Sequence, residues 1–138
     1  MSNEKIKHLE LIQAIITRMN QNSFQIKGWM LTIVSALLAL FASSNNGIYI
    51  SIGIIPVTIF WFLDAFYLQQ ERKFRGVYND VAGITDERDR KEIKDFEMPI
   101  QKYQCGKYCY FNVLFSITEL PLYGMIIVGL VGASIILN

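Results

Sequence analysis

The chain has 138 residues, of which 52% are hydrophobic and 18% are charged, and its formal net charge is +1. Soluble domains usually carry about 25% charged residues, whereas residues 28–63 contain none here and residues 108–138 contain only Glu119. Such segregation is typical of membrane spans and disfavours a soluble helical bundle. The near-neutral net charge also excludes a bulk electrostatic argument for nucleic-acid binding.

The first predicted element is an amphipathic helix within an N-terminal cytoplasmic segment, residues 1–23. Over residues 4–19, apolar side chains recur at helical spacing on one face. They are Ile6, Leu9, Ile12 or Ile16, and Met19. We expect this helix to lie on the inner membrane surface, or to pack against the second cytoplasmic segment or a neighbouring subunit; its mixed charge favours packing against protein. The sequence NQNS at 20–23 predicts a turn and an N-cap before the first span.

A transmembrane helical hairpin is predicted over residues 24–68, and a third transmembrane helix over residues 109–138. The three apolar spans run over about Gly28–Ser43 (or from Phe24, if the Lys27 ammonium reaches the headgroups), Ile48–Leu68 and Phe111–Leu137. About 20 helical residues cross a hydrocarbon core of about 30 Å. The expected fold is therefore an all-α membrane protein with three transmembrane helices.

The basic residues predict the orientation in the membrane. Four of the 13 Lys and Arg residues precede the first span, nine lie between the second and third spans, and the turn at 43–47 has none. Short loops rich in Lys and Arg stay cytoplasmic. The N-terminus and residues 69–108 are thus expected inside a bacterial inner membrane, with the 43–47 turn and Asn138 on the periplasmic side.

Small residues form a stripe along the first span, at steps of three and four that keep them on one side of a helix. They are Gly28, Thr32, Ser35 or Ala36, Ala39, and Ala42 or Ser43. In lipid, such a stripe lets another helix approach closely. It could also line a narrow pore, although packing is the commoner use.

One aspartate interrupts the second span. Asp64 lies four residues before Leu68, at about the depth of Lys27 at the start of the first span. The favoured interpretation is an interhelical ion pair or hydrogen bond that fixes the hairpin near the headgroups. A gating role is the alternative, because ionisable residues inside membranes often serve function.

The second cytoplasmic segment, residues 69–108, is expected to be helical and highly charged. The second span should continue as a helix until Gly83 weakens it, and residues 85–97 predict a separate charge-alternating helix that Pro99 helps to end. With nine basic and eight acidic residues, this segment is a mixed surface.

No cofactor or metal is expected. Cys105 and Cys109 are four residues apart, His8 is the only histidine, and two thiols without further ligands make a weak metal site. The sequence contains no phosphate loop, nucleophile elbow or zinc-protease motif, so we do not expect an enzyme.

Polar residues recur along the third span at steps of four, three and four. They are Asn112, Ser116, Glu119 and Tyr123. A glutamate inside a span is costly when it faces lipid. Glu119 should therefore face either a water-filled pore, where a ring of such residues attracts cations, or a neighbouring helix to which it is hydrogen-bonded in its protonated form.

Three segments of the chain resemble a group of small bacterial membrane proteins that includes the HalA-type membrane effectors of Hailong anti-phage systems. They are KIKHLELIQAIITRMNQNSFQIKGW at 5–29, FWFLDAFYLQQERKFRGVY at 60–78 and SITELPLYG at 116–124. The resemblance implies a homo-oligomeric, tetrameric inner-membrane pore. It also implies a nucleotidyltransferase-like partner whose DNA oligomer product binds the cytoplasmic part and holds the effector inactive.

If the resemblance holds, basic residues of the 69–108 segment are candidate oligonucleotide contacts, because backbone charge dominates such binding. They are Arg72, Lys73, Arg75, Arg88, Arg90 and Lys91. The expected function is an oligomeric, cytoplasmically regulated ion-conducting pore that disrupts the membrane in anti-phage defence. The alternatives are a non-conducting scaffold or anchor for a cytoplasmic partner, and an accessory subunit of a transporter or membrane enzyme.

Overall fold

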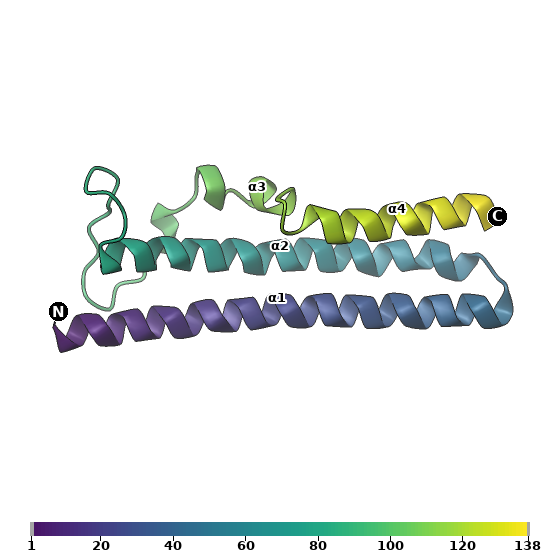
Figure 1. The fold of residues 1–138 in the computed structure, drawn as a ribbon, viewed down its shortest axis with the longest axis horizontal. Helices are drawn as coiled ribbons and strands as arrows, with labels where there is room; N and C mark the ends of the chain where they lie inside the picture. Colours follow the sequence, from purple (N-terminus) through teal and green to yellow (C-terminus); the bar gives the residue numbers. More distant parts are fainter. Residues whose placement is uncertain (1, 138) are drawn as a thin grey trace.

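A computed structural model describes residues 2–137, and the prediction of an all-helical fold is confirmed over these residues, which contain no strand. The elements are α1 (Asn3–Ser44), α2 (Ile48–Ala82), the short 3-10 helices η1 (Ile100–Lys102) and η2 (Gly106–Tyr108), α3 (Tyr110–Leu114) and α4 (Leu120–Leu137). Figure 1 shows α1 and α2 side by side as an antiparallel hairpin, with α4 along the opposite side of α2. Asn138, which the sequence analysis expects on the periplasmic side, lies outside the described residues.

Helix α1 is longer than expected, because it continues without a break through residues 20–23, where the sequence predicted a turn. The Ser2 hydroxyl caps its N-terminus by accepting a hydrogen bond from the Lys5 amide, and Asn45 in the left-handed conformation ends it. Ser23 lies mid-helix, where its hydroxyl donates to the carboxylate of Asp64 instead of capping a new helix. Packing against α2 therefore overrides the local turn preference of these polar residues.

Helix α2 ends where the sequence predicted. Gly83 adopts φ 80°, a left-handed conformation that favours glycine, and its amide donates to the Asn79 and Asp80 carbonyls. Both α1 and α2 are long and apolar enough to cross a membrane. At 1.5 Å per residue they measure about 63 Å and 52 Å, so each extends well beyond a hydrocarbon core of about 30 Å.

The third apolar segment is not the single helix that the sequence predicted. Helix α3 ends at Leu114, residues 115–119 form turns, and α4 begins at Leu120. Pro121 explains the restart, because proline has no amide hydrogen for an upstream carbonyl but fits the first turn of a new helix. Helix α4 is about 27 Å long, which makes it shorter than α1 and α2.

The expected charged helix over residues 85–97 is also wrong, since these residues form turns and irregular chain. The Arg90 guanidinium instead donates to the carbonyls of Gly83 and Thr85, beside the C-terminus of α2. Charge alternation alone cannot hold a helix that has almost no apolar face to bury.

Three buried clusters hold the elements together. One joins Met30 and Val34 of α1 to α2 and to Tyr123 of α4, and another joins α3 to Ala65 and Leu68 of α2. The third packs the N-terminal half of α1 against the other end of α2 and the following loop, through Ile12, Ile16, Val77 and Tyr103. This agrees with the expected packing of the N-terminal helix on the second cytoplasmic segment, although His8 is buried there and Ile6 is 38% exposed.

Candidate functional site

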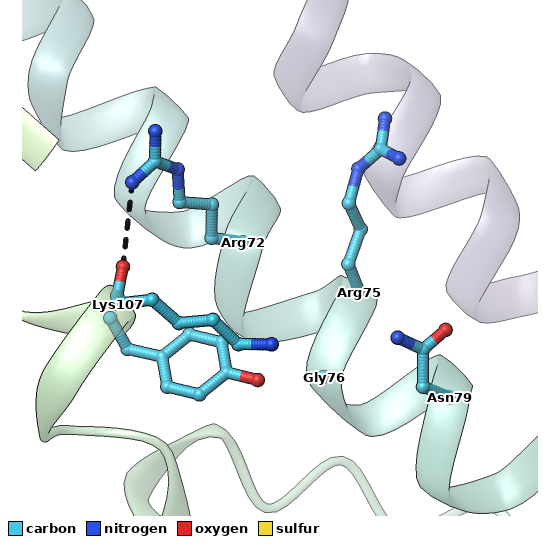
Figure 2. Close-up of a pocket in the computed structure, with 6 residues that line it drawn as sticks. Arg72, Arg75, Gly76, Asn79 and Lys107 are labelled. Atoms are coloured by element: carbon cyan, nitrogen blue, oxygen red, sulfur yellow. Dashed lines mark hydrogen bonds between the residues drawn. The ribbon is translucent and has the colours of Figure 1, made fainter. Parts of the chain in front are cut away.

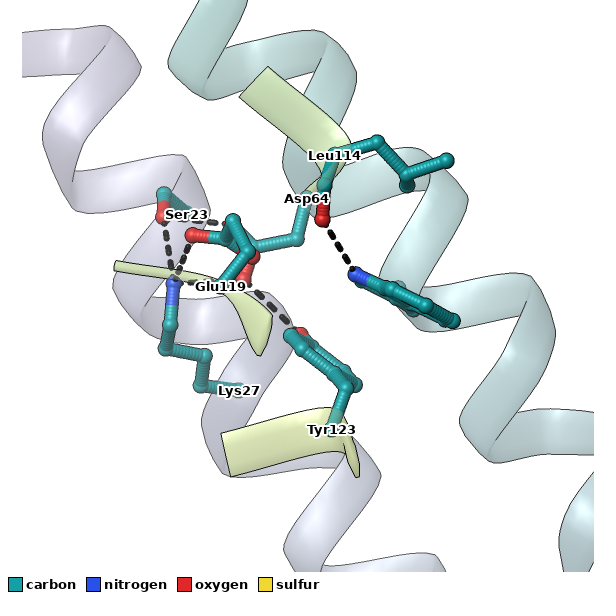
Figure 3. A network of polar contacts seen from close by, with 7 residues as sticks. Ser23, Lys27, Asp64, Leu114, Glu119 and Tyr123 are labelled. Atoms are coloured by element: carbon teal, nitrogen blue, oxygen red, sulfur yellow. Dashed lines mark hydrogen bonds and ion pairs between the residues drawn. The ribbon is translucent and has the colours of Figure 1, made fainter. Parts of the chain in front are cut away.

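The candidate site is a cluster of polar side chains where α1, α2 and the start of α4 meet (Figure 3). Helix α1 contributes Ser23 and Lys27, which lie one turn apart on the same face. Helix α2 contributes Asp64, and the third segment contributes Glu119 and Tyr123, again one turn apart. We call these five residues the Lys27 cluster.

An ammonium between two carboxylates forms the centre of this cluster. Lys27 Nζ lies 2.5 Å from Asp64 Oδ2 and 3.1 Å from Glu119 Oε1. Both carboxylate side chains are fully buried, whereas the Lys27 side chain is 23% exposed. Because a buried charge is costly without a partner, Lys27 is what makes the burial of two acidic residues tolerable here.

Neutral hydroxyl groups complete the hydrogen bonding of Asp64. The Ser23 hydroxyl donates to Oδ1 at 2.5 Å, and the Tyr123 hydroxyl donates to Oδ2 at 2.8 Å. Lys27 Nζ also donates to Ser23 Oγ at 3.0 Å. Asp64 thus accepts from three side chains on two different segments, so it fixes the positions of α1 and α4 relative to α2.

The cluster is not fully satisfied. Glu119 Oε2 is buried and has no hydrogen-bond partner among the described residues, and the same holds for Ser116 Oγ in the turn just before it. Leaving such an atom unpaired costs about 1–3 kcal/mol. With both carboxylates ionised the cluster carries one net negative charge, and one added proton makes it neutral. An unpaired carboxylate oxygen and one excess negative charge are therefore what Lys27 leaves uncompensated in this cluster.

The cluster is flanked by the Trp61 ring at Tyr123 and by a cavity at Ser23 and Lys27. The Trp61 ring stacks on Tyr123 with 6.3 Å between centroids, and its Nε1 donates to the Leu114 carbonyl at 3.1 Å. A cavity of about 490 Å³ adjoins the cluster at Ser23 and Lys27, and continues past Glu71, Arg72, Arg75 and Thr118. The ammonium is accordingly the part of the cluster nearest to an opening.

The sequence predictions for Asp64 and Lys27 agree with this geometry in their structural interpretation, since the two residues form an interhelical ion pair. The gating alternative stays a prediction.

The four predicted pore-lining residues do not form one ridge. Glu119 and Tyr123 are fully buried inside the chain, and Ser116 lies in the turn between α3 and α4. Asn112 is exposed on α3 and donates to the Gly106 carbonyl. The break at residues 115–119 is the reason, because it interrupts the helical spacing on which the predicted ridge depended.

The six candidate oligonucleotide contacts fall into separate places. Arg72 and Arg75 line a cavity on α2 with Lys107, whereas Arg90 binds backbone carbonyls and the Lys91 ammonium lies over the Tyr103 ring at 3.8 Å. Lys73 is half-buried on α2 and Arg88 is exposed in the loop. The six residues therefore do not make one continuous basic surface.

Sequence reasoning missed Ser23 as a partner of Asp64. The available signal was its position four residues before Lys27, which places both side chains on one face of α1. Cys105 and Cys109 are free thiols. Over residues 2–137, no group of three or more His, Cys, Asp or Glu side chains is placed to hold a metal ion.

Comparison with known proteins adds no further constraint. No protein-family model, curated protein or solved structure matches this chain.

Proposed function

We propose that this protein is a bacterial inner-membrane effector that assembles as a homo-oligomer, with a tetramer favoured, and forms an ion-conducting pore under cytoplasmic control in anti-phage defence. One observation carries the proposal. A continuous face of α1, made of small and polar residues, is exposed along the whole apolar part of the helix.

This face, the α1 stripe, follows steps of four and three residues. Its members are Gln21, Gln25, Gly28, Thr32, Ser35, Ala39 and Ala42, all exposed in the single chain. A Cβ built on Gly28 would meet no atom within 4 Å. The neighbouring exposed positions carry large apolar side chains, with Trp29 at 59% and Leu40 at 48% exposure. Within one helix, the stripe therefore differs from the faces suited to lipid.

A second copy of the chain is the natural partner for such a face. Apolar or small residues spaced alternately by three and four form the seam between helices that cross at small angles, and small residues allow helices in lipid to approach closely. Three spans in one chain cannot enclose a pathway. A closed ring of identical subunits can do so, with one α1 helix from each subunit towards the axis.

The composition of the stripe allows it to face a water-filled pore. Gln21 and Gln25 carry amide groups at the cytoplasmic end, and the Thr32 hydroxyl donates to the Gly28 carbonyl, so it needs no partner from another helix. Polar groups that are already satisfied can face either a neighbouring helix or water. In this proposal the α1 stripe replaces Glu119 and Tyr123 as the pore lining.

The Lys27 cluster would then control how α1 is held. Ser23 and Lys27 lie on the buried side of α1, opposite the stripe, and bind carboxylates of α2 and of the segment before α4. Rotation of α1 about its own axis would have to break these contacts. Cytoplasmic control would act through the N-terminal half of α1, which packs against the end of α2 and the loop of residues 83–109.

Ion flux through liposomes that contain the purified protein tests the proposal. In a background with Cys105 and Cys109 replaced by serine, Thr32→Cys and Ser35→Cys should conduct, and a charged thiol reagent should reduce their flux. Leu38→Cys is the matched control, because Leu38 is 42% exposed on α1 but outside the stripe. Its flux should not respond to the reagent. Suppression of wild-type flux by DNA oligonucleotides would support the cytoplasmic ligand that the resemblance implies.

A non-conducting scaffold is the second candidate, and one observation favours it. Glu119 and Tyr123 are fully buried within the chain, so the most polar part of the third segment is used for internal packing. A scaffold predicts an intact oligomer that conducts under no condition, with or without oligonucleotide. That result would overturn the pore.

A further inference from the structure

A second, smaller cavity lies on α2 beside helix η2 (Figure 2). Its volume is about 250 Å³. Four lining residues come from α2 and two come from η2: Arg72, Arg75, Gly76, Asn79, Lys107 and Tyr108. We call it the Arg72 cavity.

The lining of the Arg72 cavity is positively charged. Three of the six residues are cationic and none is acidic. The nearest described carboxylate partner is Glu71, which accepts a bond from Arg75 Nε at 2.7 Å. Arg72 Nη1 makes only a long contact of 3.5 Å with the Lys107 carbonyl, and Lys107 Nζ lies 5.2 Å from the centroid of the Tyr108 ring. Arg72 and Lys107 are thus loosely held and suit a ligand with several anionic oxygens, whereas Glu71 already neutralises part of the charge of Arg75.

The wall of the cavity is rigidly built. A Cβ at Gly76 would lie 2.7 Å from both the Tyr108 hydroxyl and Tyr103 Cδ1, so glycine is what allows both tyrosines to pack on α2. Gln69 Nε2, two turns earlier on α2, donates to the Tyr108 carbonyl at 2.9 Å and also fixes η2 to this helix. The cations are therefore mounted on two elements held in register.

The cavity lies at the expected depth of lipid headgroups. Arg72 follows the end of the second span, at Leu68, by four residues, or about 6 Å along α2. The headgroup layer adds about 5–7 Å on each side of the hydrocarbon core. Helix α3 begins three residues after Lys107. Its Phe111 side chain is 66% exposed, and the Phe115 side chain, in the turn after α3, is 58% exposed. A phosphate in the cavity would thus have apolar surface beside it for acyl chains.

We propose that the Arg72 cavity binds the phosphate of an anionic phospholipid from the cytoplasmic leaflet, such as phosphatidylglycerol. The proposal rests on the membrane orientation given under the proposed function. The cavity has room for about one phosphate with its glycerol. An oligonucleotide needs a longer track of cations, and Arg90 and Lys91, further along the chain, are engaged with protein groups instead.

Native mass spectrometry of the purified full-length protein tests this site. The protein is mixed in detergent with equal amounts of phosphatidylglycerol and phosphatidylcholine that carry the same acyl chains, and the ratio of the two lipid adducts is measured. Wild type should favour phosphatidylglycerol. Arg72→Gln and Lys107→Gln should each lower the ratio about tenfold, as expected for the loss of one direct hydrogen bond to a charged phosphate.

Lys73→Gln is the matched control. Lys73 is the neighbour of Arg72 on α2 and carries the same charge at the same depth, but it does not line the cavity. Its adduct ratio should stay within about twofold of wild type, because loss of general surface attraction alone is screened and weak. An equal fall in all three variants, or a wild-type ratio near one, would overturn the site.

Two additions separate the remaining outcomes. If a DNA oligonucleotide displaces phosphatidylglycerol, and Arg72→Gln abolishes oligonucleotide binding, the cavity is a nucleic-acid site and the lipid proposal is wrong. Before the lipid measurement, carbonate extraction of cell membranes determines whether the chain is embedded in the membrane. A chain released by carbonate contradicts the proposed function itself, whereas an embedded chain without lipid preference contradicts the Arg72 cavity alone.

Discussion

Replacing Lys27 with methionine should destabilise the protein strongly, although methionine keeps much of the length and apolar stem of lysine. The substitution removes the ammonium that lies 2.5 Å from Asp64 and 3.1 Å from Glu119. Both carboxylates then stay fully buried without a counter-charge, and Ser23 Oγ loses a donor. The effect should therefore exceed that of losing a surface charge.

The magnitude follows from the burial of the partners. Removing one member of a buried ion pair costs about 3–5 kcal/mol, since the other charge is left unpaired. Lys27 is itself 23% exposed, and water near its position can solvate part of the remaining charge, so we expect the lower end, about 3 kcal/mol. Neutralising the acids as well, with Asp64→Asn and Glu119→Gln, should recover most of this loss.

Tryptophan fluorescence can report the unfolding of this region. Trp61 stacks on Tyr123, whose hydroxyl donates to Asp64, and replacing the exposed Trp29 by phenylalanine leaves Trp61 as the only reporter. The free energy of unfolding is measured in micelles with increasing sodium dodecyl sulfate.

Lys7→Met provides the control for this experiment, because Lys7 is exposed on the same helix. Its free energy of unfolding should change by no more than about 0.5 kcal/mol. The reasoning is refuted if Lys27→Met matches this control. It is equally refuted if the triple variant is less stable than Lys27→Met alone, because the loss could not then come from uncompensated charge.

Three further substitutions give smaller effects. Gly76→Ala should cost about 1–3 kcal/mol by overpacking against Tyr103 and Tyr108, and trypsin should cleave the 83–109 loop faster. Burial, with the hydrogen bond to Asp80, raises the pKa of Tyr103 above its ordinary 10.0. The stability that the neutral phenol contributes should therefore be full below pH 10 and fall above it. In thermal melts at increasing pH, Tyr103→Phe should remove the part of the alkaline fall in melting temperature that comes from this phenol. Ser116→Ala should leave the melting temperature unchanged or raised, because the buried hydroxyl has no partner among the described residues.

The parts of the fold that the sequence predicted are those set by local chemistry. Gly83 ends α2 because the left-handed conformation favours glycine, and the uncharged runs of α1 and α2 are visible without any tertiary contact. The ion pair of Asp64 with Lys27 was predictable from depth alone. A charge inside a span needs a partner, and only one basic residue lay near that level.

The errors share a different cause, which is that tertiary packing decided the outcome. Polar residues at 20–23 predicted a turn, yet Ser23 finds its partner on α2 and the helix continues. The third segment predicted one helix with one polar face. Its break before Pro121 turns Glu119 towards Lys27 instead. Spacing rules hold only while a helix is continuous, and no residue pattern in this segment indicates the angle at the break.

The Lys27 cluster and the Arg72 cavity should influence each other, which leads to a last prediction. Arg72 and Arg75 line both the Arg72 cavity and the larger cavity that reaches Lys27. Loss of the ammonium in Lys27→Met makes these surroundings more negative, so the variant should bind phosphatidylglycerol more weakly and show a lower adduct ratio, although Lys27 does not touch that lipid site. The effect on binding is reciprocal: phosphatidylglycerol should then stabilise Lys27→Met less than it stabilises wild type. The triple variant tests the cause, because neutralising both acids should restore the ratio. A ratio that Lys27→Met leaves unchanged would show that the two sites are electrostatically independent.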